Sequence, residues 1–136
     1  MKVFKFGGAS IKDSQSINNI LEIVSGYESD KLLIVFSAMG KTTNALEKVV
    51  DNYFKNKSEL KISILEVLNF HTEISNQLFP KNHIIFSEIN IIFDKISTFI
   101  KSNKSPSYSF VYDQIVSNGE LLSSKIIYYF LIFKNI

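Results

Sequence analysis

The feature that most constrains the fold is the run of apolar residues from Leu32 to Phe36. A strand with one solvated face alternates apolar and polar residues, whereas an unbroken apolar strand is typical of a parallel sheet covered by helices on both faces. An earlier apolar strand, Val3 to Phe6, is separated from it by residues 13–27, whose apolar positions recur at steps of three and four. This spacing predicts a helix with Asp13 as its N-cap. The sequence therefore predicts a β-α-β unit, whose right-handed crossover places both strand ends at one edge of a sheet.

Beyond residue 42 the apolar spacing is helical almost throughout. We expect five helices there, over about 46–54, 60–78, 85–99, 107–117 and 119–133. The second should end near Pro80, since proline cannot continue a helix, and Asn118 with Gly119 should separate the last two.

Length and composition narrow the class of protein. A chain of 136 residues and 15.5 kDa fits one domain, and 46% apolar residues are enough to form a core. The absence of cysteine excludes disulfides and thiol chemistry and favours the cytoplasm. All 15 cations are scattered lysines, which argues against nucleic-acid binding. The N-terminus lacks the pattern of a signal peptide, and no apolar run is long enough for a membrane span.

A two-stranded parallel sheet needs further strands beside it to be stable. The last helix, from Ile127 to Ile136, is strongly apolar and has nothing after it against which to pack. We therefore expect the chain to be the N-terminal part of a longer α/β fold, or to be completed by another chain. Homodimerisation through the apolar helix is one such arrangement.

The first candidate site follows the first strand and comprises Lys5, Phe6, Gly7, Gly8 and Ser10. Two glycines allow backbone N–H groups to approach an anion, and a lysine supplies a point charge for a phosphate. The pattern lacks the spacing of a Walker A motif and of a dinucleotide fingerprint. A tight turn with a solvated lysine explains it equally well.

The second candidate site follows the second strand, from Ser37 to Asn44. A glycine permits a bend here, and several small polar groups precede a helix whose free N–H groups favour a carboxylate or phosphate. Ligands of open α/β sheets bind beyond the carboxyl ends of the strands, where these two loops would form one cleft. Alternatively, Thr42 or Thr43 simply caps the helix.

A third candidate is Glu120, in the first turn of the final helix, where the helix dipole alone would favour a carboxylate. Asp113 is interpreted as a charge on a helix surface. The histidines, His71 and His83, have no paired ligand at a suitable interval, so we interpret them as surface or helix-face residues and predict no metal site.

Together the segments KFGGAS, VFSAMGKTTNAL and SNGELLSSKI resemble, in order, the motifs of aspartate kinases in the amino acid kinase family. The resemblance extends from Lys2 to about Leu131, and residues 52–104 match only as a helical insertion. It implies the N-terminal, acceptor-binding lobe of a carbamate kinase-like, three-layer α/β/α sandwich, helix-rich over residues 1–136. SAMGKTTNAL in particular separates aspartate kinases from glutamate, acetylglutamate and uridylate kinases.

The resemblance also implies a reaction, in which the γ-phosphoryl group of Mg²⁺-ATP is transferred to the β-carboxylate of L-aspartate. By this resemblance, Lys5 would neutralise negative charge on the phosphoryl group as it is transferred. Lys5 would belong to a phosphate loop that also includes Phe6, Gly7, Gly8 and Ser10. Ser37 and Thr43 would orient aspartate, and Glu120 would hold its α-ammonium group. A loose phosphoryl-transfer transition state needs this kind of positive charge and no protein nucleophile.

Two departures from the family pattern matter. Ala9 replaces the usual threonine of the first motif. The family's downstream arginine, catalytic aspartate, nucleotide lobe and regulatory domains have no counterpart before Ile136, so we expect these residues alone not to complete a catalytic cycle. A different amino acid kinase and a nonenzymatic helical interaction module stay open as alternatives.

Overall fold

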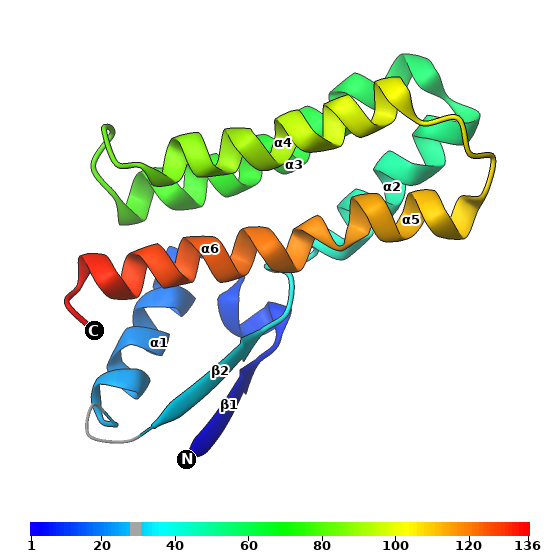
Figure 1. Cartoon of the computed structure of the whole chain (residues 1–136). Helices are drawn as coiled ribbons and strands as arrows, with labels where there is room; N and C mark the ends of the chain where they lie inside the picture. Colours follow the sequence, from blue (N-terminus) through cyan, green and yellow to red (C-terminus); the bar gives the residue numbers. More distant parts are fainter. Residues whose placement is uncertain (28–30) are drawn as a thin grey trace.

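The N-terminal part of the fold is a pair of parallel strands joined by a crossover helix (Figure 1). The computed structural model describes residues 1–27 and 31–136. Its elements in this first part are β1 (Lys2–Phe6), the short 3-10 helix η1 (Gly8–Ile11), α1 (Ser14–Ser25) and β2 (Leu32–Phe36). The remainder is helical, with α2 (Thr42–Lys55), α3 (Lys57–Leu78), α4 (Ile85–Ser102), α5 (Tyr108–Val116) and α6 (Asn118–Phe133).

The predicted β-α-β unit is confirmed. The two strands pair in parallel, in a register that runs from Lys2 opposite Leu32 to Phe6 opposite Phe36. Asp13 is the N-cap of α1, because its carboxylate accepts a hydrogen bond of 2.8 Å from the backbone N–H of Ser16. The helix ends slightly earlier than predicted, at Ser25.

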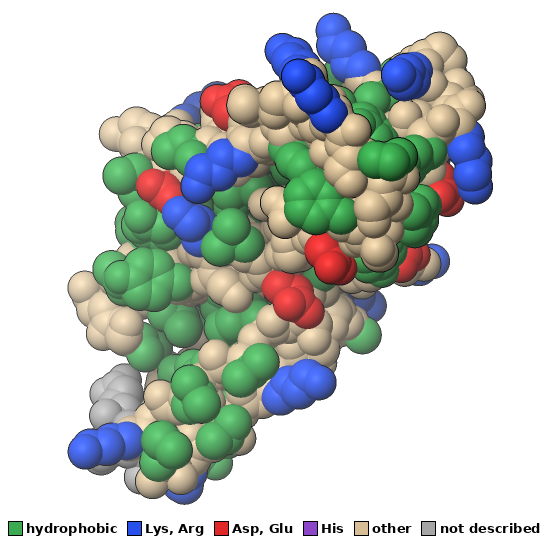
Figure 2. Space-filling model, turned by 45° about the vertical axis from the view of Figure 1, so that its right-hand side comes forward, with side chains coloured by type: hydrophobic (Ala, Val, Ile, Leu, Met, Phe, Trp, Pro, Cys, Tyr) green, Lys and Arg blue, Asp and Glu red, His purple; other side chains and the backbone are tan. Residues whose placement is uncertain are grey.

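The expectation that both faces of the sheet are covered is wrong for the part of the chain that the structure describes. Side chains on one face, including those of Phe4 and Phe6, pack toward α1 and Tyr27. On the other face Val3, Leu33 and Val35 are 58%, 51% and 43% exposed. The later helices lie beyond the carboxyl end of the sheet rather than over this face (Figure 1), and Figure 2 shows apolar side chains at the surface in this lower region.

The five later helices have the predicted number and order, with two differences. The break between α5 and α6 is at Ser117, and Asn118 and Gly119 already belong to α6. α6 also has packing partners, because Ile126, Ile127 and Phe130 are buried in the main core. Part of its apolar surface is therefore covered by the preceding helices, whereas Tyr128 and Ile132 stay exposed.

The core lies between α6 and the other helices. α2 packs on α3 and α5, and α3 and α4 form an antiparallel pair above α6 (Figure 1). At the end of α3, Phe79 contacts the ring of Phe130 edge-on at 6.0 Å. Among the described residues, no helix has both the length and the hydropathy that crossing a lipid bilayer requires.

Candidate functional site

The first two loops contact each other at the carboxyl ends of the strands. The backbone N–H of Ser37 donates to the carbonyl of Phe6, and that of Gly40 donates to the carbonyl of Gly8, both at 3.0 Å. A Cβ on Gly8 would lie 2.7 Å from the carbonyl oxygen of Ala38 and 2.9 Å from that of Gly40. Gly8 is therefore needed for the close approach of the loops themselves.

Gly7 differs from its neighbour. A Cβ added there would meet nothing within 4 Å, so this side of the first loop is open to solvent and to a ligand. The backbone N–H of Ser10 donates to the Gly7 carbonyl at 2.9 Å, which closes the turn. Phe6 and Ser10 also line a pocket of about 320 Å³ against α1.

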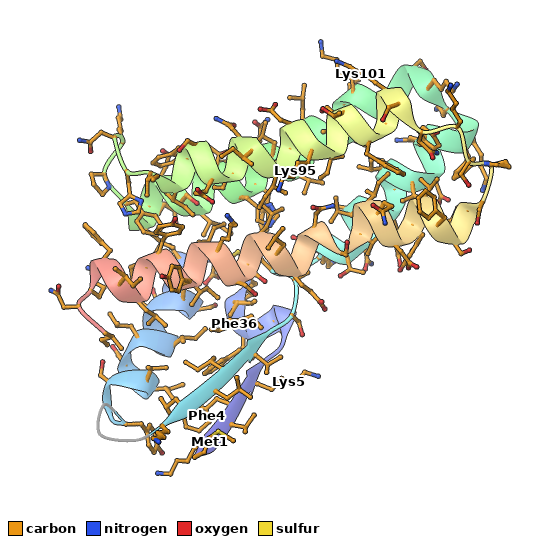
Figure 3. All side chains as sticks on the ribbon, in the orientation of Figure 1. Met1, Phe4, Lys5, Phe36, Lys95 and Lys101 are labelled. Atoms are coloured by element: carbon orange, nitrogen blue, oxygen red, sulfur yellow. The ribbon has the colours of Figure 1, made fainter. Side chains whose placement is uncertain are left out.

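Lys5 is exposed and extends from β1 away from α1 (Figure 3). It pairs in register with Val35, on the sheet face that is uncovered in this structure. Its side chain therefore stands on the side of the first loop that the described helices leave open.

The third motif packs directly against the second loop. Ser123 donates a hydrogen bond of 2.7 Å from its Oγ to the carbonyl of Ser37. A Cβ on Gly119 would lie 3.0 Å from the Cβ of Ala38 and 3.3 Å from Cγ2 of Thr42, so a larger residue would require these neighbours to shift by a few tenths of an ångström. Sequence reasoning missed the roles of Gly119 and Ser123. The signal was their i, i+4 spacing, which puts two small residues on one helix face.

This packing places Thr43 and Glu120 at one pocket of about 320 Å³. Its lining residues come from the starts of α2 and α6 and the end of α5: Thr43, Tyr112, Asp113, Val116, Ser117 and Glu120. Of the four side chains predicted to contact substrate, Thr43 and Glu120 line this pocket, whereas Lys5 and Ser37 do not. Two carboxylates and three hydroxyls here suit a ligand that carries an ammonium group.

A tyrosine forms part of the pocket wall. The hydroxyl of Tyr112 donates to Oε1 of Glu47 at 2.7 Å, which ties α5 to α2. This bond to a carboxylate is the main cause of the raised pKa of Tyr112, and desolvation adds to it. The ring is therefore held in place as a hydrogen-bond donor.

The positions of Thr42 and His71 in the structure differ from those that the sequence predicted. Lys41 occupies the N-cap position of α2 without a side-chain hydrogen bond, so neither Thr42 nor Thr43 caps the helix. Thr42 is buried, and its Oγ1 lies 3.4 Å from Nε2 of His71. His71 is a helix-face residue as predicted, but the face is the buried one, and desolvation lowers its pKa to about 4.

The remaining titratable candidates, His83 and Asp113, lie on helices or between them and form no group of three candidate metal ligands among the described residues. His83 is half-buried and stacks on Phe79 with ring centroids 4.4 Å apart. Asp113 is exposed on α5, as expected, and also reaches the pocket wall. Over residues 1–27 and 31–136 no three His, Asp or Glu side chains are grouped so that they could hold a metal ion.

A parallel β-α-β unit whose glycine loop and helix N-termini gather beyond the carboxyl ends of the strands defines an α/β fold of the class whose ligands bind at that edge. The chain belongs to the amino acid kinase family, because the profile named "Amino acid kinase family" matches residues 1–136. The family membership inferred from the three motifs is confirmed.

Several curated proteins are similar to this chain. The bifunctional aspartokinase/homoserine dehydrogenase of Buchnera aphidicola is 31% identical over 132 residues, which cover 90% of this chain and 16% of that protein. Aspartokinase 1, chloroplastic, of Arabidopsis thaliana is 30% identical over 129 residues, covering 91% of this chain and 22% of that protein. The chain thus spans about a fifth of the length of these relatives.

Two solved structures share the fold. Aspartokinase III of E. coli in complex with aspartate and ADP matches with a TM-score of 0.83 and 25% identity over 98% of this chain and 29% of that chain. The same enzyme in complex with lysine and aspartate matches with a TM-score of 0.84. The predicted fold class, a helix-rich portion of the amino acid kinase α/β fold, is confirmed.

Proposed function

We propose that this chain forms the acceptor-binding part of an aspartate kinase, which transfers the γ-phosphoryl group of ATP to the β-carboxylate of L-aspartate and yields 4-phospho-L-aspartate. The observation that carries the proposal is the convergence of the three motifs at one edge of the sheet, with Thr43 and Glu120 at one pocket. The similarity to aspartokinase structures solved with aspartate and ADP supports the same substrates. The product would enter amino acid biosynthesis by reduction or a further transfer at its acyl phosphate.

The roles that we propose for the individual residues follow from the charges on L-aspartate and on the phosphoryl group. L-Aspartate carries an ammonium group and two carboxylates, so it needs one anionic partner and several hydrogen-bond donors. Glu120 supplies the anion, and Thr43 supplies a hydroxyl in the same pocket. We assign Ser37, at the end of β2, to the orientation of the reacting carboxylate. Lys5 offsets the negative charge of the phosphoryl group as it is transferred.

The residues present fit the phosphates of ATP only in part. Gly7 leaves its loop open to a close approach by an anion, and Ser10 offers a hydroxyl in the same turn. The space that a Cβ of Gly8 would fill is already taken by two carbonyl oxygens, so we assign Gly8 to loop packing. Among the described residues no three carboxylate or imidazole side chains are grouped so that they could hold a metal ion, and we propose that Mg²⁺ is bound with ATP largely by the C-terminal lobe of the family fold.

The test uses the protein at its full natural length and measures ADP and acyl phosphate formation with L-aspartate or L-glutamate as acceptor. We expect turnover with aspartate and its loss in Lys5→Ala. Glu120→Gln should raise KM for aspartate by about 10- to 100-fold, since a hydrogen bond between charged groups is lost. Activity that persists in Lys5→Ala would remove the role assigned to that lysine.

The matched control is Asp113→Asn, which removes a second carboxylate from the same pocket wall. We expect KM for aspartate to change by less than about threefold, because the proposal assigns the ammonium group of aspartate to Glu120 and gives Asp113 no contact with the substrate. A preference for glutamate would indicate a different amino acid kinase. Thermal stability unaffected by aspartate, glutamate, UMP or Mg²⁺-ATP, together with no turnover, would favour the nonenzymatic interaction module.

The cysteine-free composition supports a cytoplasmic location, although the Arabidopsis relative carries the description chloroplastic.

We also propose a homodimer through the apolar residues that α6 leaves exposed, among them Tyr128 and Ile132. Sedimentation of the natural protein tests this, and a monomer at all concentrations would reject it.

A further inference from the structure

We propose that His71 is a positioning residue, which acts through Thr42 to hold the loop of residues 37–43 in the conformation that presents Thr43 to the acceptor. We refer to residues 37–43 as the acceptor loop. The part of this inference that concerns substrate rests on the proposed aspartate kinase function, whereas the part that concerns the loop does not.

The hydrogen bonds of His71 define which ring nitrogen carries the proton. Nδ1 lies 2.7 Å from the backbone carbonyl of Val67, one turn earlier in α3. A carbonyl oxygen can only accept a hydrogen bond, so Nδ1 is the protonated nitrogen and donates. In the neutral ring Nε2 is then an acceptor, and it faces Oγ1 of Thr42 at 3.4 Å. The imidazole thus offers the buried Thr42 hydroxyl an acceptor.

The side chain of Thr42 is held from two sides. Its hydroxyl faces His71 of α3, while its methyl group, Cγ2, lies 3.3 Å from the position of a Cβ on Gly119 of α6. Its backbone N–H donates to the carbonyl of Met39 at 2.9 Å, within the acceptor loop. Thr42 therefore connects the loop to α3 and α6, and Thr43 follows it directly in the chain.

The neighbour of His71 supports the same loop. Gly40 has a φ of +52°, a conformation that favours glycine, and a Cβ there would lie 3.5 Å from Cζ of Phe70. The Phe70 and His71 rings contact each other edge-on at 5.1 Å. Two consecutive residues of α3 thus face two positions of the acceptor loop.

A polar pair is unexpected here on packing grounds. His71 and Thr42 are both buried, and leucine and valine would fill similar volumes without the cost of burying polar atoms. The mutual hydrogen bond gives the pair a directional role that apolar residues cannot supply. The segment that resembles a helical insertion, residues 52–104, thereby contributes to the site through α3.

The experiment compares matched substitutions in the protein at its full natural length. Thr42→Val removes the hydroxyl and keeps the methyl group, and Thr42→Ser does the reverse. His71→Leu removes the acceptor, and His71→Gln retains one near the position of Nε2. Amide hydrogen exchange over residues 39–43, read by mass spectrometry, reports the loop directly and does not depend on activity.

We expect exchange over residues 39–43 to be about fivefold faster in Thr42→Val and in His71→Leu, as the loss of one net hydrogen bond implies. Thr42→Ser and His71→Gln should stay within about twofold of the natural protein, and the Thr42→Val/His71→Leu double variant should be no faster than either single variant. Exchange in α1 serves as the internal reference. Unchanged loop exchange in Thr42→Val, which is nearly isosteric and should fold, would overturn the proposal, as would additive effects in the double variant.

The kinetic readout separates positioning from general stability. Thr42→Val should raise KM for aspartate by about fivefold and leave KM for ATP within about twofold, with Thr42→Ser close to the natural protein. Equal changes in both KM values would contradict a role specific to the acceptor. If the protein shows no aspartate-dependent turnover, the proposed function fails, and hydrogen exchange still decides whether His71 holds the loop.

Discussion

At the scale of single residues, the two adjacent glycines of the first loop have different tasks. Gly8 is surrounded by the carbonyl oxygens of Ala38 and Gly40, whereas Gly7 has open space on its Cβ side. Sequence reasoning treated them as one phosphate cradle because both follow a strand. The difference depends on which loop packs against them, and this is visible only in the tertiary structure.

The two glycines can be compared by replacing each with alanine. Gly8→Ala should lower the free energy of unfolding by about 2 kcal/mol, because the added methyl group collides with backbone that cannot easily move. Gly7→Ala should change it by less than about 1 kcal/mol, since its φ of −76° suits alanine. Urea unfolding measures both values. Equal effects of the two substitutions would contradict the loop contact.

His71 should make stability depend on pH. Its folded pKa is about 4, below the ordinary value of 6.5, because burial disfavours the charged ring. Between these values the unfolded state binds a proton that the folded state does not, so the free energy of unfolding falls as pH falls. From about pH 7.5 to about pH 5 the expected loss is about 2 kcal/mol.

Urea unfolding at the two pH values tests this, with His71→Gln as the control. The glutamine does not titrate in this range, so the difference between the two proteins isolates the histidine from any carboxylates that also titrate. An identical pH dependence in the two proteins would show that folding does not lower the pKa of His71.

At the scale of elements, two ion pairs between helices differ in burial. Lys125 of α6 pairs with Glu88 of α4, and the side chains are 34% and 18% exposed. Lys48 of α2 pairs with Glu66 of α3 at 3.3 Å, with 60% and 56% exposed. Solvent screens the second pair far more than the first.

We therefore expect Lys125→Met to destabilise the protein by about 1–3 kcal/mol, because it leaves a largely buried carboxylate without its cation. Lys48→Met should cost less than about 0.5 kcal/mol. Differential scanning calorimetry gives both values. Addition of about 0.5 M salt should reduce only the destabilisation caused by Lys48→Met. Similar costs for the two substitutions would mean that α4 and α6 do not depend on this pair.

The helices illustrate which signals in the sequence suffice. Apolar spacing predicted each helix, since the face that packs must recur every three or four residues. The end of α5 was misplaced because Asn118 and Gly119 are turn-forming residues by local preference. Gly119 lies inside α6 instead, where the absence of a side chain allows close contact with Ala38 and Thr42. A tertiary contact thus overrides the local preference.

At the scale of the whole molecule, one face of the sheet lacks a cover among the described residues. Val3, Leu33 and Val35 form an apolar strip there, beside the exposed Lys5. Exposed apolar area of this kind is usually a contact surface. This chain covers 29% of the aspartokinase III chain that it matches. An apolar sheet face of this kind is suited to packing against further strands or helices of such a fold.

A polypeptide of these 136 residues should accordingly bind a hydrophobic dye such as ANS while retaining its helical circular dichroism. Replacing Val3, Leu33 and Val35 together by threonine should reduce the fluorescence by at least about twofold, because β-branched threonine keeps the strand while removing apolar surface. The same substitutions on exposed Ile62, Leu65 and Ile91 of α3 and α4 are the control. Equal reductions in the two variants would show that the sheet face is not the dye-binding surface.

The sequence by itself determined the β-α-β unit, the helices and the three motifs, because periodicity and turn chemistry are local properties of the chain. The distances between motifs were decided only by the tertiary structure. Thr43 and Glu120 reach one pocket because Gly119 and Ser123 let α6 approach the acceptor loop. The burial of His71 against Thr42 likewise depends on how α3 packs on α2, since contacts between residues 29 positions apart leave no periodic signal in the sequence.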